Sequence, residues 1–273
     1  MSLTDTPTLT YPRTSLTWLG SCLEVILPTQ CLVCTRPLRR ERICYRCRPP
    51  LPDLRGIQLS RCARCFEPLP LSAQVGSVCE PCHTHPLLPD SIRFIWEYDG
   101  LARDLIRTMK YRPSTLLAGL CGSLLKDSIP SLFNHSSWDL IIPVPSSRIT
   151  YRKRLFHPCV ELAHAISRQV NAPLCHALTH DKHRLPQASL DHDARLRKLR
   201  HLFRVRHPGV IAGKRILLVE DVITTGATIA AAAYQLRQAG ATHVDVIALA
   251  RTRVWKRFRA RVHTIFTPTK RMT

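Results

Sequence analysis

Acidic residues are scarce in this 273-residue sequence, which has 19 Asp and Glu against 40 Lys and Arg and a formal net charge of +21. Most of the imbalance lies in residues 98–273, where 29 basic side chains face 11 acidic ones. The shortage of negative charge favours a polyanionic partner or an acidic protein as the binding partner. A general gain in solubility is the alternative explanation.

Two further features are missing from the sequence. No apolar run reaches the ~18 residues that a membrane-spanning helix needs. The first residues, MSLTDTPTLTYPRT, lack the basic start and the small-residue cleavage site of a secretory signal. We therefore expect a cytoplasmic protein without a membrane span, whose twelve cysteines are reduced or metal-bound rather than disulfide-bonded.

The length suits one α/β domain with a small additional module. Residues 1–27 are predicted to be a polar leader followed by an amphipathic helix over 15–27, which Pro28 ends. Residues 28–90 are cysteine-rich and are predicted to form a zinc-ribbon-like module. Residues 91–273 are predicted to form a mostly parallel sheet flanked by helices.

Eight cysteines of the module occur as four C-x2-C pairs, a spacing typical of zinc sites because each pair offers two thiolates to one tetrahedral ion. They are Cys31, Cys34, Cys44, Cys47, Cys62, Cys65, Cys79 and Cys82. Two structural Zn²⁺ sites are the simplest assignment. Neighbouring or alternating pairs could share an ion, one site could be lost, His83 or His85 could replace Cys82, and redox or iron-sulfur use is a further alternative.

The most informative stretch is RILLVEDVITTGAT, which begins at Arg215. Its apolar run Ile216–Val219 is typical of a buried parallel strand. Two acids, Glu220 and Asp221, follow the run. After them comes a short polar loop at the start of an alanine-rich helix, consisting of Thr224, Thr225, Gly226, Ala227 and Thr228.

This order of residues suits a ribose phosphate. Ligands bind at the carboxyl ends of parallel strands, where helix-start N–H groups and hydroxyls hold a phosphate. Gly226 lets the backbone approach the anion. The carboxylates of Glu220 and Asp221 do not suit a phosphate, so we assign them to ribose hydroxyls. A strand-turn-helix with one capping Thr is the alternative, but it leaves both acids unexplained.

A second strand end carries cations. Leu140–Ile142 is a short apolar run, and Ser146, Arg148 and Arg152 follow it, where they could hold a diphosphate. Lys110 belongs to a cationic and aromatic cluster that could also meet a phosphate. A basic surface loop and an ordinary helix C-terminus are the respective alternatives.

Hydrophobic periodicity predicts the remaining elements. The sequence predicts strands over 91–98 and 243–250, and helices over 101–109, 116–125, 158–170 and 229–239, the last closed by Gly240. The 91–98 strand is expected to bury one face. Residues 183–206 are polar and strongly basic. The tail Arg251–Arg261 interleaves basic with aromatic side chains, which suits either single-stranded nucleic acid or a solvated strand face.

The stretch from Ile216 to Thr228 resembles the phosphoribosyl pyrophosphate (PRPP) loop of type I phosphoribosyltransferases. The resemblance implies that Glu220 and Asp221 hold the ribose 2′ and 3′ hydroxyls, that the loop after them holds the 5′-phosphate, and that Mg²⁺ rides on the diphosphate. Purine-salvage members carry an Asp where this chain has Thr224, so a purine acceptor is not expected.

A narrower resemblance covers about residues 20–252. Cysteine knuckles, a Tyr98–Tyr111 segment, the IPVP strand end, the Pro186-Gln187 loop and a basic run before Phe203 resemble the competence protein ComF family. The family usually has Gly-Phe-Asn-Gln where this chain has residues 155–158, LFHP. Its PRPP loop commonly begins Asp-Asp rather than Glu-Asp.

The family resemblance implies handling of single-stranded DNA in natural transformation or DNA utilisation, with PRPP or a nucleotide as a bound ligand. A second hypothesis is an active Mg²⁺-dependent phosphoribosyltransferase with an unknown, non-purine acceptor. In it, Glu220 and Asp221 would steady the ribose while Arg148 and Arg152 stabilise the leaving pyrophosphate. A third is a structural partner of a helicase or recombination protein.

Overall fold

The structure is a computed structural model of the chain. It describes residues 30–38, 41–53, 61–70, 72–83, 89–112, 114–133, 137–146, 156–180 and 202–253. The chain divides into two compact units, Met1–Pro50 and Leu51–Thr273. The first two cysteine pairs therefore belong to the smaller unit and the last two to the larger. The leader and the helix predicted over 15–27 lie outside the described residues.

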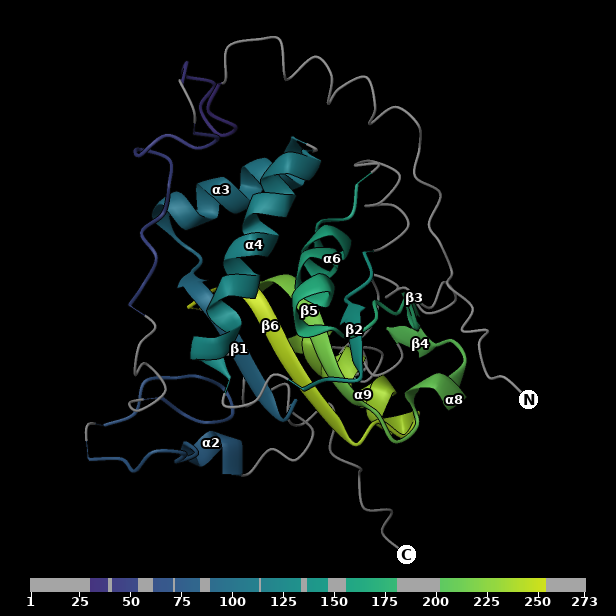
Figure 1. Cartoon of the computed structure of the whole chain (residues 1–273). Coiled ribbons are helices and arrows are strands. Elements are labelled where there is room, and N and C mark those ends of the chain that lie inside the picture. The colour runs from purple at the N-terminus through teal and green to yellow at the C-terminus, as the bar shows by residue number, and fades with distance from the viewer. Residues whose placement is uncertain are drawn as a thin grey trace, which may run out of the picture. The chain divides into compact units, whose positions relative to one another are not determined.

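The larger unit contains a four-stranded sheet of β1 (Ser91–Glu97), β6 (His243–Arg251), β5 (Arg215–Ile223) and β2 (Leu140–Pro143), in that order (Figure 1). All three neighbouring pairs are parallel. Nearly every residue of the central strands β5 and β6 is buried, as their continuous apolar runs require. The predicted parallel sheet is confirmed.

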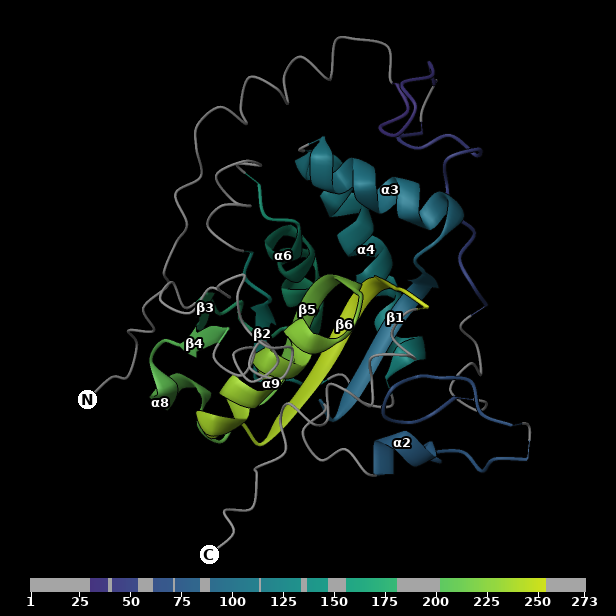
Figure 2. The same cartoon turned by 180° about the vertical axis from the view of Figure 1, so that it is seen from behind.

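Helices cover both faces of this sheet (Figures 1 and 2). On one side, α4 (Thr115–Leu132) packs against α6 (Pro158–Val170), with α3 (Gly100–Tyr111) beside α4. On the other side lies α9 (Ala227–Gln238). The α4–α6 contact is close because α4 has Gly122 there, where an added Cβ would come within 2.6 Å of the Ala165 Cβ.

The structure corrects several predicted bounds. α6 has the predicted ends, whereas α4 runs seven residues further than expected and accommodates Pro130 in its last turn. Strand β1 is buried on both faces, not one. The reason is that residues after Arg61 pack along it: the Ile92 N–H donates to the Arg64 carbonyl (2.6 Å), and the Phe66 ring meets the Phe94 ring edge-on.

Four short elements were not predicted: α2 (Glu80–His83), β3 (Leu178–His180), β4 (Phe203–Val205) and α8 (Pro208–Ile211). β3 and β4 form a separate antiparallel pair, of which β3 precedes the basic stretch 183–206 and β4 lies near its end. Among the described residues, none of the helices has the length and apolar character that crossing a membrane requires.

Arg251 is not part of an exposed basic tail, and this prediction was wrong. It is the last residue of β6 and only 2% exposed. Hydrophobic patterning did not reveal its burial because Arg is normally a surface residue. The rest of the predicted tail beyond Arg253 lies outside the described residues.

Candidate functional site

The polar loop Thr224–Thr228, hereafter the anion loop, joins β5 to α9 at the carboxyl edge of the sheet. Gly226 caps the helix with φ of 77°, a conformation that favours glycine. The Thr225 hydroxyl oxygen lies 3.4 Å from the Ala227 N–H, which donates to it. The first N–H groups of a twelve-residue helix therefore meet hydroxyl side chains at a sheet edge, an arrangement suited to a phosphate.

The acid pair, Glu220 and Asp221, lies within β5 rather than after it, because the strand continues to Ile223. Asp221 forms an ion pair with Lys110 from the last turn of α3, with 2.6 Å between Oδ1 and Nζ. Both side chains are largely buried. Burial lowers the pKa of Lys110, but the charge of Asp221, its hydrogen bond and the nearby Glu220 and Cys159 together outweigh burial and raise that pKa overall. Lys110 therefore neutralises Asp221.

Glu220 is held by different partners. Its Oε1 accepts hydrogen bonds from the Asp221 N–H (3.0 Å) and from the Cys159 thiol (3.3 Å). Burial, and then the charge of Asp221, raises the pKa of Glu220 to about 8. Burial also raises the pKa of Cys159 well above its usual value, so Cys159 is a thiol donor. At neutral pH the acid pair thus carries one negative charge, which Lys110 balances.

Sequence reasoning missed Cys159. It stands alone near the start of α6, outside any spacing motif, and only the packing of α6 on β5 brings it to Glu220. Ligand atoms of Cys159, Glu220 and Asp221 lie within 4.8 Å of one another. The ammonium group of Lys110 already supplies a cation there.

The end of β2 reaches the same edge of the sheet. β2 pairs with β5, and beyond it the Val144 N–H donates to the Val219 carbonyl (2.9 Å). Ser146 follows, two residues on. Of the predicted diphosphate ligands Ser146, Arg148 and Arg152, only Ser146 lies within the described residues.

His157 holds this second loop in place. Its Nε2 accepts a hydrogen bond from the Ser146 N–H (2.8 Å), and burial lowers its pKa to about 4, so the ring is neutral at physiological pH. His157 lies in the LFHP segment that departs from the ComF pattern. In this segment, His157 therefore fixes the loop at Ser146. A comparison with the family's sequence pattern could not reveal this contact.

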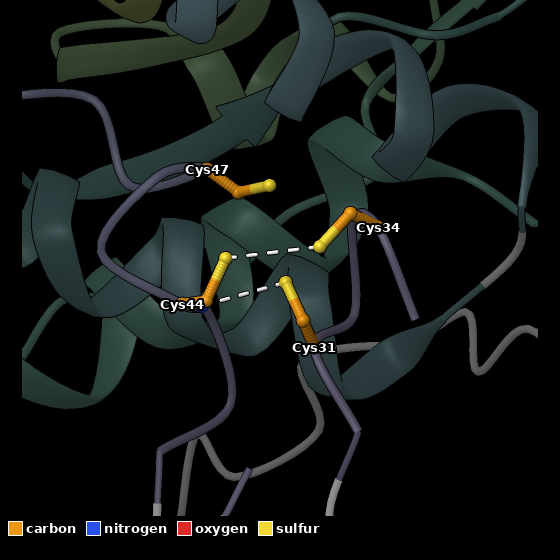
Figure 3. Close-up of side chains that lie close together, drawn as sticks. All are labelled: Cys31, Cys34, Cys44 and Cys47. Atoms are coloured by element: carbon orange, nitrogen blue, oxygen red, sulfur yellow. Dashed lines mark hydrogen bonds between the residues drawn. The ribbon is translucent and has the colours of Figure 1, made fainter. Parts of the chain in front are cut away.

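The first cysteine cluster, in the smaller unit, consists of Cys31, Cys34, Cys44 and Cys47, whose sulfurs point toward one another (Figure 3). Cys34 and Cys44 Sγ lie 3.7 Å apart, and the Cys44 N–H donates to Cys31 Sγ (3.4 Å). Burial alone would raise the pKa of Cys31, but hydrogen bonds from the Cys34 and Cys44 backbone lower it to about 6. Cys31 therefore favours the thiolate, whereas burial and then hydrogen bonds with Cys34 and Cys44 raise the pKa of Cys47.

The second cysteine cluster, in the larger unit, consists of Cys62, Cys65, Cys79 and Cys82. The Cys65 and Cys79 sulfurs are 3.6 Å apart, and Cys62 Sγ accepts from two backbone N–H groups, those of Cys65 and Cys79. Hydrogen bonds from the Cys65 and Cys82 thiols lower the pKa of Cys62 strongly.

Both clusters fit a tetrahedral metal ion. Four sulfurs at the usual Zn–S distance of about 2.3 Å are separated by about 3.8 Å, close to the S–S distances in both clusters. Each cluster combines neighbouring C-x2-C pairs, which resolves the pairing that the sequence left open. Four protein ligands leave no open coordination position, so a Zn²⁺ bound there would be structural.

The sheet, the acid pair and the anion loop define a phosphoribosyltransferase-type domain, and residues 157–266 match the phosphoribosyl transferase domain family. The chain is 27% identical over 227 residues to DNA utilization protein YhgH of Shigella flexneri, an alignment covering 81% of this chain and 90% of that protein. The same figures hold for YhgH of Escherichia coli K12. These relatives confirm the ComF family recognised from the sequence.

Other similarities cover shorter stretches. Orotate phosphoribosyltransferase of Methanospirillum hungatei is 58% identical over 41 residues, which are 15% of this chain and 24% of that enzyme. The solved Bacillus subtilis glutamine PRPP amidotransferase is 21% identical with a TM-score of 0.36, and the similarity covers 48% of this chain but only a quarter (25%) of that one.

Proposed function

We propose that this chain is a ribose-phosphate-binding protein of the ComF type, which binds PRPP with Mg²⁺ and handles single-stranded DNA. The observation that carries the proposal is the acid pair of the half-buried Glu220 and the buried Asp221 beside an anion loop. Two carboxyl groups suit the ribose hydroxyls, and the N–H groups around Gly226 suit the 5′-phosphate. Bound Mg²⁺ would neutralise the diphosphate.

Each residue of the site has a separate role in this proposal. Lys110 holds the Asp221 side chain in place until the ribose hydroxyls arrive. Cys159 and the Asp221 N–H orient Glu220, whose second oxygen stays available to the ligand. His157 fixes the backbone at Ser146, the start of the loop proposed to meet the diphosphate.

A calorimetric titration with Mg²⁺ and PRPP tests this site. The double variant Glu220→Ala, Asp221→Ala is expected to bind at least about 30-fold more weakly, since a hydrogen bond to the ion-paired Asp221 contributes about 1.5–3 kcal/mol and one to the neutral Glu220 about 0.5–1.5 kcal/mol. The control is Asp104→Ala, Asp127→Ala, which removes two exposed acids of α3 and α4. Equal affinity of the double variant and wild type would refute the site.

A transferase reaction on the same site is the second candidate. It is favoured by both acids being held in place beside the anion loop. In this reaction an acceptor nucleophile forms the bond to ribose C1 while the bond to pyrophosphate breaks, and the pyrophosphate carries away the electron pair. Pyrophosphate release during the PRPP titration, with water as acceptor, would establish that the chemistry occurs.

Single-stranded DNA requires a different surface from the ribose site. Deoxyribose lacks the 2′ hydroxyl that the acid pair is proposed to hold, so DNA sugars are poor ligands there. We assign DNA to the smaller unit, where Tyr45 is 74% exposed and Arg46 stacks on its ring at 5.6 Å. An exposed ring for base stacking beside cations for the backbone suits single strands.

The DNA proposal predicts a steep dependence of affinity on salt, since each neutralised phosphate contributes about −0.7 to the logarithmic slope. Tyr45→Ala is expected to weaken binding about 5- to 100-fold, because base stacking contributes about 1–3 kcal/mol. Tyr45→Phe keeps the ring and is the matched control. Fluorescence anisotropy with a labelled oligonucleotide measures both effects. A flat salt response, or equal losses in the two variants, would count against the assignment.

A further inference from the structure

Arg251 is a fully buried cation that holds part of the second cysteine cluster. Its Nη1 donates to the carbonyl of Cys65 (3.3 Å) and lies 2.9 Å from Glu67 Oε1. Its Nη2 donates to Glu97 Oε1 of β1 (3.3 Å), and its guanidinium stacks on the Phe94 ring at 4.2 Å. One side chain therefore joins the segment Cys62–Glu67, hereafter the knuckle, to two strands of the sheet.

The backbone next to Arg251 holds the start of the anion loop. Arg251 pairs with Ile223 in the β5–β6 register. The following residue, Thr252, donates its N–H to the Ile223 carbonyl (2.9 Å) and its hydroxyl to the Thr224 carbonyl (3.1 Å). Two consecutive residues thus contact the second cluster at one end and the anion loop at the other.

A second buried arginine also contacts the knuckle. Arg93 of β1 donates to the Ala63 carbonyl (2.8 Å) and to the Leu132 carbonyl at the end of α4 (2.7 Å). Its guanidinium also stacks on the Phe66 ring at 5.1 Å. The segment Ala63–Glu67 is therefore packed into the sheet domain. A shift of the knuckle backbone must alter the contacts of the two arginines that bind it.

Metal binding should control the position of this knuckle. When the thiolates lose their ion, the four sulfurs repel or separate, and the Cys65–Glu67 backbone moves with them. Arg251 then loses two of its partners while it stays buried, and an incompletely paired buried charge is costly. Movement of the β6 end relieves that cost, and the same end supports Thr224.

We propose that Arg251 is a positioning residue that couples metal binding at the second cysteine cluster to ligand binding at the anion loop. The part that concerns ligand affinity rests on the proposed ribose-phosphate function. Thermodynamic linkage requires the coupling to be mutual: zinc tightens PRPP binding, and PRPP tightens zinc binding by the same factor.

The test uses the full chain with Cys34→Ser and Cys47→Ser, so that only the second cluster binds zinc. Zinc affinity is measured by competition with a dye selective for zinc over magnesium, with and without saturating Mg²⁺ and PRPP. PRPP is expected to tighten zinc binding about fivefold or more. An unchanged zinc affinity overturns the proposal.

Two variants locate the coupling. Arg251→Lys keeps the charge but loses the two-pronged contact, and is expected to lose most of the PRPP effect. Thr252→Val removes only the hydroxyl bond to Thr224, leaves the knuckle contacts intact, and is expected to halve the effect or more. If Arg251→Lys does not fold, the effect of PRPP on zinc affinity in Thr252→Val tests the proposal. Full coupling in the variant that folds would assign the linkage to other residues and overturn the role of Arg251.

Hydrogen exchange separates this inference from the proposed function, because it needs no PRPP. Removal of zinc is expected to speed amide exchange in residues 224–228 several-fold while exchange in α6 stays unchanged. Unchanged exchange in the anion loop overturns the inference even if PRPP binds. A rise of equal size in α6 indicates general unfolding and also overturns it. Faster loop exchange in a protein that binds no PRPP refutes the proposed function alone.

Discussion

Replacing Glu220 by Gln is expected to stabilise the ligand-free protein at pH 8 while weakening its affinity for PRPP. Burial and the charge of Asp221 raise the pKa of Glu220 to about 8 in the folded protein. Gln keeps an oxygen for the Asp221 N–H and the Cys159 thiol but carries no charge. The expected gain at pH 8 is roughly 2–4 kcal/mol, since one pKa unit corresponds to about 1.4 kcal/mol.

The pH dependence of the free energy of unfolding shows why Glu220→Gln should stabilise the protein. Between the ordinary pKa of about 4.3 for a Glu and the folded value of about 8, the folded protein keeps a proton that the unfolded chain releases. The wild type therefore loses stability as pH rises through this window. The neighbouring Cys159, Asp221 and Lys110 are the same in both proteins. The advantage of Glu220→Gln should grow from about pH 4.3 and level off above about pH 8.

Urea unfolding at pH 6 and pH 8.5 measures the effect. Asp127→Asn, at an exposed acid of α4, is the control and should change stability by less than about 0.5 kcal/mol. A Glu220→Gln variant that is no more stable than wild type at pH 8.5 would mean that ionised Glu220 does not destabilise the folded protein. The opposed effects on stability and binding would mark Glu220 as a residue kept for the ligand.

Loss of the second cysteine cluster is expected to destabilise the larger unit, whereas loss of the first cluster is not. Cys62→Ser with Cys82→Ser should cost the larger unit more than about 3 kcal/mol, because Arg93 and Arg251 lose buried partners. Cys34→Ser with Cys47→Ser changes the smaller unit. The larger unit should then unfold as in wild type.

Native mass spectrometry and hydrogen exchange check this prediction together. Each pair of substitutions should remove one zinc per chain. Only the loss of the second cluster should increase exchange in β1 and β6, the strands that Arg93 and Arg251 join to the knuckle. Equal protection of these strands in both variants would show that the second cluster is an appendage rather than part of the domain.

The sequence predicted the sheet and the anion loop well because both are local patterns. Ile216–Val219 is a continuous apolar run, and Gly226 occupies the position that needs a positive φ. The predicted Lys110 does reach the site, where it pairs with Asp221. Whether it also contacts a phosphate stays a prediction.

The contacts missed from the sequence all depend on tertiary packing. Cys159 meets Glu220 only because α6 lies on β5, and His157 meets Ser146 only because the chain returns after the segment that separates them. Arg251 looked like the start of a basic tail, yet Glu67, 184 positions earlier in the sequence, pairs with it inside the domain. No local pattern carries such information.

The central claim is that the acid pair recognises the two hydroxyls of a ribose phosphate. The most direct test compares ribose 5-phosphate with 2-deoxyribose 5-phosphate in the calorimeter, for wild type and for Glu220→Gln with Asp221→Asn. Wild type is expected to prefer ribose by at least about tenfold, the value of one hydrogen bond to a charged group, and the variant is expected to lose this preference. Equal binding of the two sugars by wild type would contradict the account.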